Sequence, residues 1–253
     1  MAQCSSPPES RDGSRFSTSG GSLDLHRPGL SITPLVIALV GLVLEARIAA
    51  APDVLVIRHQ QGRKVSDATE SAIRTGCRSI ISFGIAGGLA PGLSPGDLIV
   101  ASAVIDGQTV RPTDAAWSGR LLQTIPGSTY APILGADVAI VDPALKQELH
   151  NVVGAAAVDM ESHVVGRLAV RHGLAFAALR VIIDPAHRAI PDAALAGFGG
   201  GGTDVRSVLR QLKASPSQTI TLARLGLDLL RARSRLVRTR HLLDSAFHHA
   251  EQR

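Results

Sequence analysis

The amino-acid sequence predicts an α/β fold in which a central β-sheet is covered by helices. Short, apolar segments rich in Ile and Val alternate with stretches of helical character along the 253-residue chain. Hydrophobic residues make up 45% of the chain and charged residues 19%, which is typical of a globular protein. Because only five Phe, one Tyr and one Trp are present, we expect a core of Ala, Val, Ile and Leu side chains.

Six apolar segments are the predicted strands. They are short and uniformly apolar, which is typical of strands that are buried on both faces of a sheet. They are Leu35–Val43, Val54–Ile57, Ser79–Ile85, Leu98–Val104, Ala155–Val158 and Ala175–Ile183. Three stretches between them, Ser66–Thr75, Pro143–Asn151 and Glu161–His172, are predicted to be helices.

The N-terminal residues 1–33 are predicted to be a disordered leader, because they are rich in Ser, Gly, Pro and Arg and have little apolar periodicity. The strongest apolar run, Leu35–Leu44, is shorter than the ~18–20 residues of a membrane span. It could instead be the core of a signal peptide, but the stretch before it is long and contains acids as well as bases. We therefore favour a buried first strand.

Residues 34–243 are predicted to form one domain that ends in helices. The predicted strands stop after Asp184, and from Thr203 we expect two helices, the second over 217–243. This helix has an apolar stripe of Leu222, Leu225, Leu229, Ala232 and Leu236, with Arg224, Arg231, Arg235 and Arg238 largely away from it. It is a basic amphipathic helix. Residues 244–253 are predicted to be a flexible tail.

Positive charge is concentrated at the C-terminal end. The formal net charge is +5, but residues 206–253 carry ten basic and three acidic side chains, whereas residues 34–205 carry 13 and 15. A nucleic-acid-binding domain would have its basic stripe in the body, so we predict no nucleic-acid partner. The basic helix favours peripheral contact with an anionic membrane surface; a solvated helix packed on the core by its leucine stripe is the alternative.

The sequence predicts neither a disulfide framework nor a metal site. The two cysteines, Cys4 and Cys77, favour a reducing, cytoplasmic location. The three candidate histidines lack metal-ligand spacing; they are His163, His172 and His187. The glycine pattern at Gly197–Gly202 does not follow a strand within a βαβ unit, so a flexible loop is favoured over a dinucleotide fingerprint.

Three segments carry residues suited to chemistry. The strand from Ser79 runs into a turn with Gly84, Gly87 and Gly88, where backbone N–H groups can approach a ligand closely. Glu161 begins a helix, where the macrodipole favours its ionised form. Asp184 ends an apolar strand, where ligand sites of α/β proteins tend to form. Taken singly, each segment also fits an ordinary turn or helix end.

Together and in this order, the three segments resemble the nucleoside phosphorylase and nucleosidase family. Phe83–Asp97 is similar to the family's glycine turn and Gly-Asp strand start, Val158–Ser162 to its ribose-binding Met-Glu segment, and Arg180–Asp184 to its Arg-x-x-Ser-Asp segment. The resemblance implies a three-layer α/β/α fold with a mixed central sheet. It also implies a homo-oligomer and makes Leu35–Val43 the first strand.

Within this family, the chain most resembles the hopanoid-associated phosphorylases, also described as adenosylhopane nucleosidases. The resemblance rests on Leu44–Arg47 after the first strand, on Phe83–Gly88, and on the tail segments Thr203–Leu209 and Pro216–Gln218. It implies that the enzyme releases adenine from adenosylhopane in hopanoid side-chain biosynthesis. The location would be cytoplasmic, at the inner face of the membrane.

The chemistry of this reaction suits the residues that the resemblance assigns to it. Cleavage of an N-glycosidic bond develops oxocarbenium character on the ribose and negative charge on the leaving base. The resemblance implies that Glu161 binds the ribose hydroxyls, that Asp184 is the general acid, and that Glu45 contacts or activates the attacking water. The implied substrate-binding residues are Gly84, Ile85, Ala86, Gly87, Met160, Arg180 and Ile140. A general-acid Asp needs a pKa raised by burial, which its place after three apolar residues favours.

Departures from the family pattern favour hydrolysis over phosphorolysis. The family often has Ser at the positions of Ile85 and Ile183, and phosphate-using relatives often have Arg near Ser82. No cofactor is predicted, but inorganic phosphate stays open as a co-substrate. Its candidate ligands are Arg47, Arg58 and Arg63.

Two other functions also stay open. One is a nucleosidase for methylthioadenosine or adenosylhomocysteine, and the other is a catalytically weak purine-binding protein of the same fold. Around Ile140 the family often places an aromatic residue over the base, so an aliphatic wall here is compatible with a bulky lipid substrate.

Overall fold

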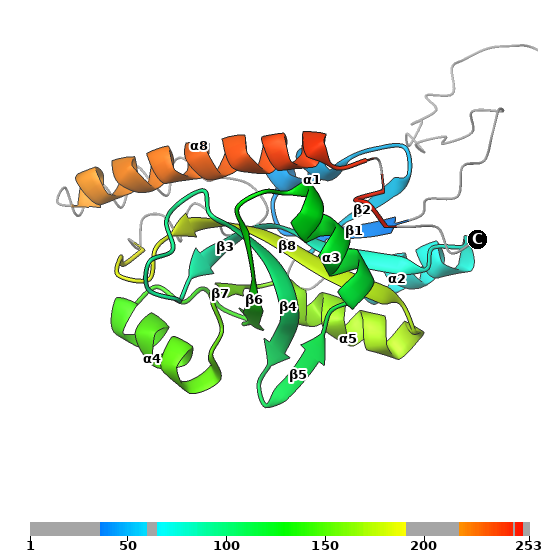
Figure 1. The fold of residues 1–253 in the computed structure, drawn as a ribbon, viewed down its shortest axis with the longest axis horizontal. Coiled ribbons are helices and arrows are strands. Elements are labelled where there is room, and N and C mark those ends of the chain that lie inside the picture. Colours follow the sequence, from blue (N-terminus) through cyan, green and yellow to red (C-terminus); the bar gives the residue numbers. More distant parts are fainter. Residues whose placement is uncertain (1–35, 60–64, 191–217, 245, 250–253) are drawn as a thin grey trace, which may run out of the picture. The chain divides into compact units, whose positions relative to one another are not determined.

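The alternating segments form one mixed sheet with helices on both faces (Figure 1). The computed structural model describes residues 36–59, 65–190, 218–244 and 246–249. The strands are β1 (Val36–Val40), β2 (Val54–Arg58), β3 (Ser79–Gly88), β4 (Leu98–Asp106), β5 (Thr109–Pro112), β6 (Ser128–Gly135), β7 (Ala157–Asp159) and β8 (Ala175–Asp184). The helices are α1 (Val43–Ala49), α2 (Val65–Arg74), α3 (Ala115–Thr124), α4 (Pro143–Val153), α5 (Ser162–His172) and α8 (Gln218–Leu242).

All six predicted strands and all three predicted helices of the core are present, with shifted ends. The first strand ends three residues early, at Val40, because Gly41 and Leu42 turn the chain into α1. β3 continues three residues past the predicted end to Gly88, so the turn predicted at Gly84, Gly87 and Gly88 is wrong and these glycines lie in the strand. Four elements were not predicted: β5, β6, α1 and α3. In β6 the outer half is polar and Pro132 interrupts it, so no uniformly apolar run marks the strand.

The sheet is mixed, with the strand order β2-β1-β3-β7-β6-β4-β5, and β8 pairs with both β3 and β4. β1, β2, β3 and β8 are parallel, whereas β7 is antiparallel to β3 and β4 is antiparallel to β8. The pairings β3–β8–β4–β6–β7–β3 close a ring of strands. As a result, the C-terminal half of β3 borders both β7 and the end of β8.

Two apolar layers cover the sheet. One contains α1, α3 and α8, whose Trp117, Leu121 and Leu236 are buried against β3, β4 and β8. The other contains α2 and α5, with Ala72 and Leu168 among its buried residues. A third, smaller cluster lies beside α4. The core is mainly aliphatic, as the composition predicted.

The C-terminal helix α8 matches the predicted helix 217–243 to within one residue at each end. Its Leu225 and Leu236 are buried, whereas Arg224 and Arg238 are exposed. The residues after it depart from the predicted flexible tail: Phe247 is fully buried, and its carbonyl accepts a hydrogen bond from Trp117 Nε1 at 2.7 Å. The apolar side chain of Phe247, five residues after the end of α8, packs in the core.

Several predictions fall on residues outside the described ranges. These are the leader 1–33, the loop at Gly197–Gly202 and the helix expected from Thr203. Among the described helices, none has both the length and the apolar character needed to cross a membrane.

Candidate active site

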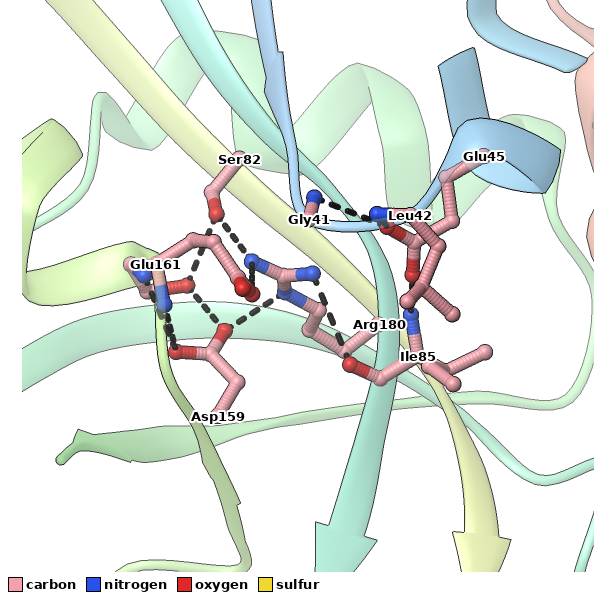
Figure 2. A network of polar contacts seen from close by, with 9 residues as sticks. Gly41, Leu42, Glu45, Ser82, Ile85, Asp159, Glu161 and Arg180 are labelled. Atoms are coloured by element: carbon pink, nitrogen blue, oxygen red, sulfur yellow. Dashed lines mark hydrogen bonds and ion pairs between the residues drawn. The ribbon is translucent and has the colours of Figure 1, made fainter. Parts of the chain in front are cut away.

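The candidate site is built around the fully buried guanidinium of Arg180, in β8 (Figure 2). Arg180 Nε lies 2.5 Å from Asp159 Oδ2, and Nη2 lies 3.3 Å from Glu161 Oε2. The guanidinium also donates to the Ser82 hydroxyl and, at 3.5 Å, to the Ile85 carbonyl. The parallel register pairs Arg180 with Gly84, so the guanidinium reaches these groups from the strand beside β3. A buried cation is thus surrounded by carboxylates.

A third carboxylate, Glu45, reaches β3 from the first turn of α1. Its Oε2 accepts hydrogen bonds from the N–H groups of Gly41 and Leu42, at 2.9 and 2.7 Å. Its Oε1 accepts one from the Ile85 N–H at 2.8 Å. Burial raises the pKa of Glu45, and the Arg180 charge and these N–H groups oppose that rise. The structure therefore brings Glu45 to the part of β3 that Arg180 also contacts.

Glu161 lies at the junction of β7 and α5, and its side chain is 15% exposed. Asp159 fixes this junction, because its Oδ1 accepts hydrogen bonds from the N–H groups of Ser162, at 2.9 Å, and Glu161, at 3.3 Å. Burial raises the pKa of Glu161 to about 8, Arg180 opposes the rise, and Asp159 and Glu45 add to it. Burial is thus the largest influence on Glu161, and its pKa stands above the ordinary value although the residue lies at the start of a helix.

Two glycines make room for these side chains. A Cβ at Gly41 would lie 2.5 Å from Glu161 Oε1, and a Cβ at Gly84 would lie 2.6 Å from Arg180 Nη1. The sequence predicted close approach of a ligand to the glycine turn. At Gly84 the approaching groups are the protein's own charged side chains.

Asp184 forms a second centre at the end of β8, where its side chain is 2% exposed. Lys146 of α4 donates to its Oδ2. A Cβ at Gly87 would lie 3.3 Å from Asp184 Oδ1 and 3.4 Å from Oδ2, so the carboxyl group faces β3 at Gly87. Burial raises the pKa of Asp184, and the Lys146 ammonium is the main opposing influence. The structure thus places Asp184 as a buried carboxyl group beside β3, as a general acid requires.

The two centres lie along the same strand. Glu45 contacts β3 at Ile85, and Asp184 contacts it at Gly87, two residues later. Because a strand rises about 3.3 Å per residue, these two backbone positions are roughly 7 Å apart. The C-terminal part of β3 therefore runs from a carboxylate cluster to a single buried acid.

The remaining predicted residues have apolar side chains that take no part in these hydrogen bonds and ion pairs. Met160 is partly exposed at the β7–α5 junction, and the Ala86 side chain belongs to the core on one face of the sheet. Ile140 packs against the smaller cluster that contains Leu89 and Leu134. No contact among the described residues joins these three side chains to Arg180.

Sequence reasoning missed Gly41, Asp159 and Lys146. Asp159 stands two residues before Glu161, and the presence of a second carboxylate so close to Glu161 could have marked it as a site residue. Lys146 was harder to predict than Asp159, because its partner Asp184 lies 38 positions away along the chain.

Comparisons with known proteins agree with this fold. A sequence model of the phosphorylase superfamily matches residues 40–212. A search of curated proteins returned no match.

Similar folds occur among solved structures. One is a mutant of futalosine hydrolase from Helicobacter pylori, with a TM-score of 0.56, 13% identity, and 83% of this chain and 97% of that chain covered. Another is a mutant of 5'-methylthioadenosine/S-adenosylhomocysteine nucleosidase from H. pylori with 5'-methylthioadenosine in its active site, with a TM-score of 0.55, 14% identity, and coverage of 82% and 98%. A putative nucleosidase of the same kind from Francisella philomiragia has a TM-score of 0.53, 15% identity, and coverage of 82% and 96%. At such identities the likeness shows the fold alone, and it confirms the predicted mixed α/β architecture.

Proposed function

The chain belongs to the phosphorylase superfamily, and we propose that it is a nucleosidase that cleaves the N-glycosidic bond of a purine nucleoside. The observation that carries the proposal is the arrangement along β3. Three carboxylates, Glu45, Asp159 and Glu161, gather around Arg180, and a buried Asp184 lies beside Gly87. Negative groups near a sugar and a proton donor near its base are the two requirements of this reaction.

The carboxylate cluster would serve the ribose. Glu161 is partly exposed, so its carboxylate can accept hydrogen bonds from ribose hydroxyls and stabilise the oxocarbenium charge as the bond breaks. Arg180 and Asp159 would hold Glu161 in place. Glu45 is held by three N–H groups and would accept the proton of the attacking water.

Asp184 would serve the base. As the glycosidic bond breaks, the electron pair passes to the purine, and a proton on N7 relieves the charge. Asp184 can supply this proton because burial raises its pKa above the ordinary value.

The charge balance of the site favours water over phosphate as the nucleophile. Arg180 is the cation of the cluster, and it is already paired with Asp159 and Glu161. A phosphate dianion would need a cation that is not already paired, whereas a neutral water molecule needs none. We therefore propose hydrolysis, with phosphorolysis as the alternative.

For the substrate, we propose adenosylhopane. The support is the resemblance of Leu44–Arg47 and Phe83–Gly88 to hopanoid-associated enzymes and the aliphatic setting of Ile140, which would suit a bulky, apolar substituent. The alternative, methylthioadenosine or adenosylhomocysteine, is favoured by the shared fold with the H. pylori nucleosidase.

An adenine-release assay tests these proposals directly. We expect the purified protein to release adenine from adenosylhopane at a rate that does not change when phosphate is added. Methylthioadenosine and adenosylhomocysteine, offered in competition, should be turned over more slowly. A phosphate-dependent rate would indicate phosphorolysis, and no adenine release from any of the three nucleosides would overturn the proposed reaction.

We further propose that α8 holds the enzyme at an anionic membrane surface. Leu227 and Leu230 are each 57% exposed on α8, and the neighbouring Arg231 and Arg238 are also exposed. The single acid of the helix, Asp228, is buried, so its exposed charges are positive. Basic residues close to an anionic bilayer contribute ~1 kcal/mol each.

A cavity between α1 and α8 adds to this basic surface. Its volume is about 610 Å³, and Arg47, Arg240 and His241 are among the residues that line it. Arg47 is exposed there, and we propose that it meets an anionic headgroup.

Co-sedimentation with liposomes tests the membrane contact. We expect binding to phosphatidylglycerol vesicles that weakens as salt rises, because screening acts on exposed charges. The double substitution Arg233→Glu and Arg238→Glu should abolish sedimentation, and Arg171→Glu on α5 is the matched control because it is exposed on another helix. Binding that is insensitive to salt, or equal in both variants, would contradict the electrostatic contact.

A further inference from the structure

Lys146 is the one residue of α4 that is fully buried among otherwise exposed or partly buried neighbours. A buried ammonium group is costly unless it is paired and hydrogen-bonded. A helix that only covered the sheet would present an apolar side chain there. Leu149 and Val153, three and seven positions later, do pack against the apolar cluster on this side of the sheet. Apolar packing therefore does not explain why a lysine occupies this position.

The ammonium of Lys146 is fully engaged around Asp184. It donates to Asp184 Oδ2, to the Arg188 carbonyl at 3.0 Å and to the Pro185 carbonyl at 3.5 Å. The three acceptors lie in one segment, the end of β8 and the turn that follows. Lys146 thus fixes both the carboxyl group and the backbone that carries it.

This arrangement leaves the other carboxyl oxygen available. A Cβ at Gly87 would lie 3.3 Å from Asp184 Oδ1 and 3.4 Å from Oδ2, so both oxygens lie near β3, but no described residue donates a hydrogen bond to Oδ1. Three charged groups act on Asp184: Lys146 from α4, Arg188 from the turn after β8, and Asp228 from α8. Arg188 is itself paired with Asp228, so Lys146 is the cation in direct contact with Asp184.

We propose that Lys146 is a positioning residue that turns Asp184 Oδ1 toward the purine and stabilises the carboxylate left after the proton has moved. The inference rests on the proposed function and goes beyond it by naming the residue that orients the general acid Asp184.

The proton and electron movements balance as follows. The C1′–N9 bond breaks and its electron pair passes to the purine, while the proton on Asp184 Oδ1 moves to N7. Water adds to C1′ and loses a proton to Glu45. Asp184 is then a carboxylate beside the Lys146 ammonium, and a proton from solvent restores the acid while Glu45 releases its own.

The test measures the affinity for free adenine by calorimetry between pH 5 and pH 10, together with turnover. In the wild type, adenine binding should weaken as Asp184 ionises, because a carboxylate cannot donate to N7. In Lys146→Met, the pH at which binding weakens should rise by about one unit or more, because the buried carboxylate has lost its cation. Lys146→Arg retains the charge and should keep the wild-type pH dependence. Arg171→Met, which removes an exposed charge on α5, is the control.

The outcomes separate the two proposals. A shifted pH dependence in Lys146→Met supports the role of Lys146, even if the wild type turns over no nucleoside and the proposed reaction fails. An unshifted dependence, with nucleoside turnover intact in the wild type, overturns the role of Lys146 alone. No adenine binding by the folded wild type at any pH overturns both.

Discussion

Asp184→Asn should lower turnover of the purine nucleoside by roughly 10²–10⁴-fold, which is the usual contribution of general acid catalysis. Asparagine keeps the size of the side chain but has no acidic proton to give to N7. The loss should appear in kcat at saturating substrate, because protonation of the leaving base belongs to the transition state. Steady-state kinetics on the nucleoside that the wild type prefers would measure it.

The buried pair supplies the control for this experiment. Asp184→Asn leaves the Lys146 ammonium buried without its counter-ion, which destabilises the fold in its own right. The double variant Lys146→Met and Asp184→Asn removes both charges and should recover much of the thermal stability but none of the turnover. Recovery of turnover in the double variant would show that Asp184 is not the acid.

Much of the site was predictable because its residues lie close to recognisable chain features. Glu161 begins a helix after a short strand, and Asp184 ends an apolar strand before a proline. Both signals are local. The family resemblance then joined them to Arg180 and Glu45, and the structure brings Glu45, Glu161 and Arg180 into one network.

Other features of the site depend on contacts between distant residues, which a local sequence pattern does not reveal. The first predicted strand was too long because Leu35–Val43 is uniformly apolar, although β1 stops at Val40 and α1 begins at Val43. The Gly41–Leu42 turn between them receives the Glu45 carboxylate. Apolar character alone cannot separate a buried strand from the buried start of a helix.

Lys146 illustrates a different limit. It occupies the same helical stripe as Leu149 and Val153, so a charged residue stood among apolar positions in the sequence. That pattern indicates a buried lysine, but it does not identify the partner. Only the chain path from α4 to the end of β8 places the ammonium on Asp184.

At pH 9, where Glu161 is ionised, Glu161→Gln should reduce turnover by roughly 10²–10³-fold, because a neutral amide stabilises a developing oxocarbenium ion far less than a carboxylate does. The fold should survive, since Arg180 keeps Asp159 as a partner at 2.5 Å. Glu148→Gln, at an exposed position of α4, is the matched control and should leave turnover unchanged.

The same substitution should change how stability depends on pH. Glu161 has a pKa of about 8 in the folded protein, above its ordinary value of 4.5, so the folded state binds the extra proton between these two values. The contribution of Glu161 to the free energy of unfolding is therefore fully present below about pH 4.5. It is lost as the pH rises through 8, by at most about 1.4 kcal/mol per pH unit. Glu161→Gln cannot ionise and should lack this loss. Urea unfolding at pH 5 and pH 9 should show the variant gaining stability relative to the wild type at the higher pH, and parallel curves for the two proteins would mean that burial does not hold Glu161 protonated.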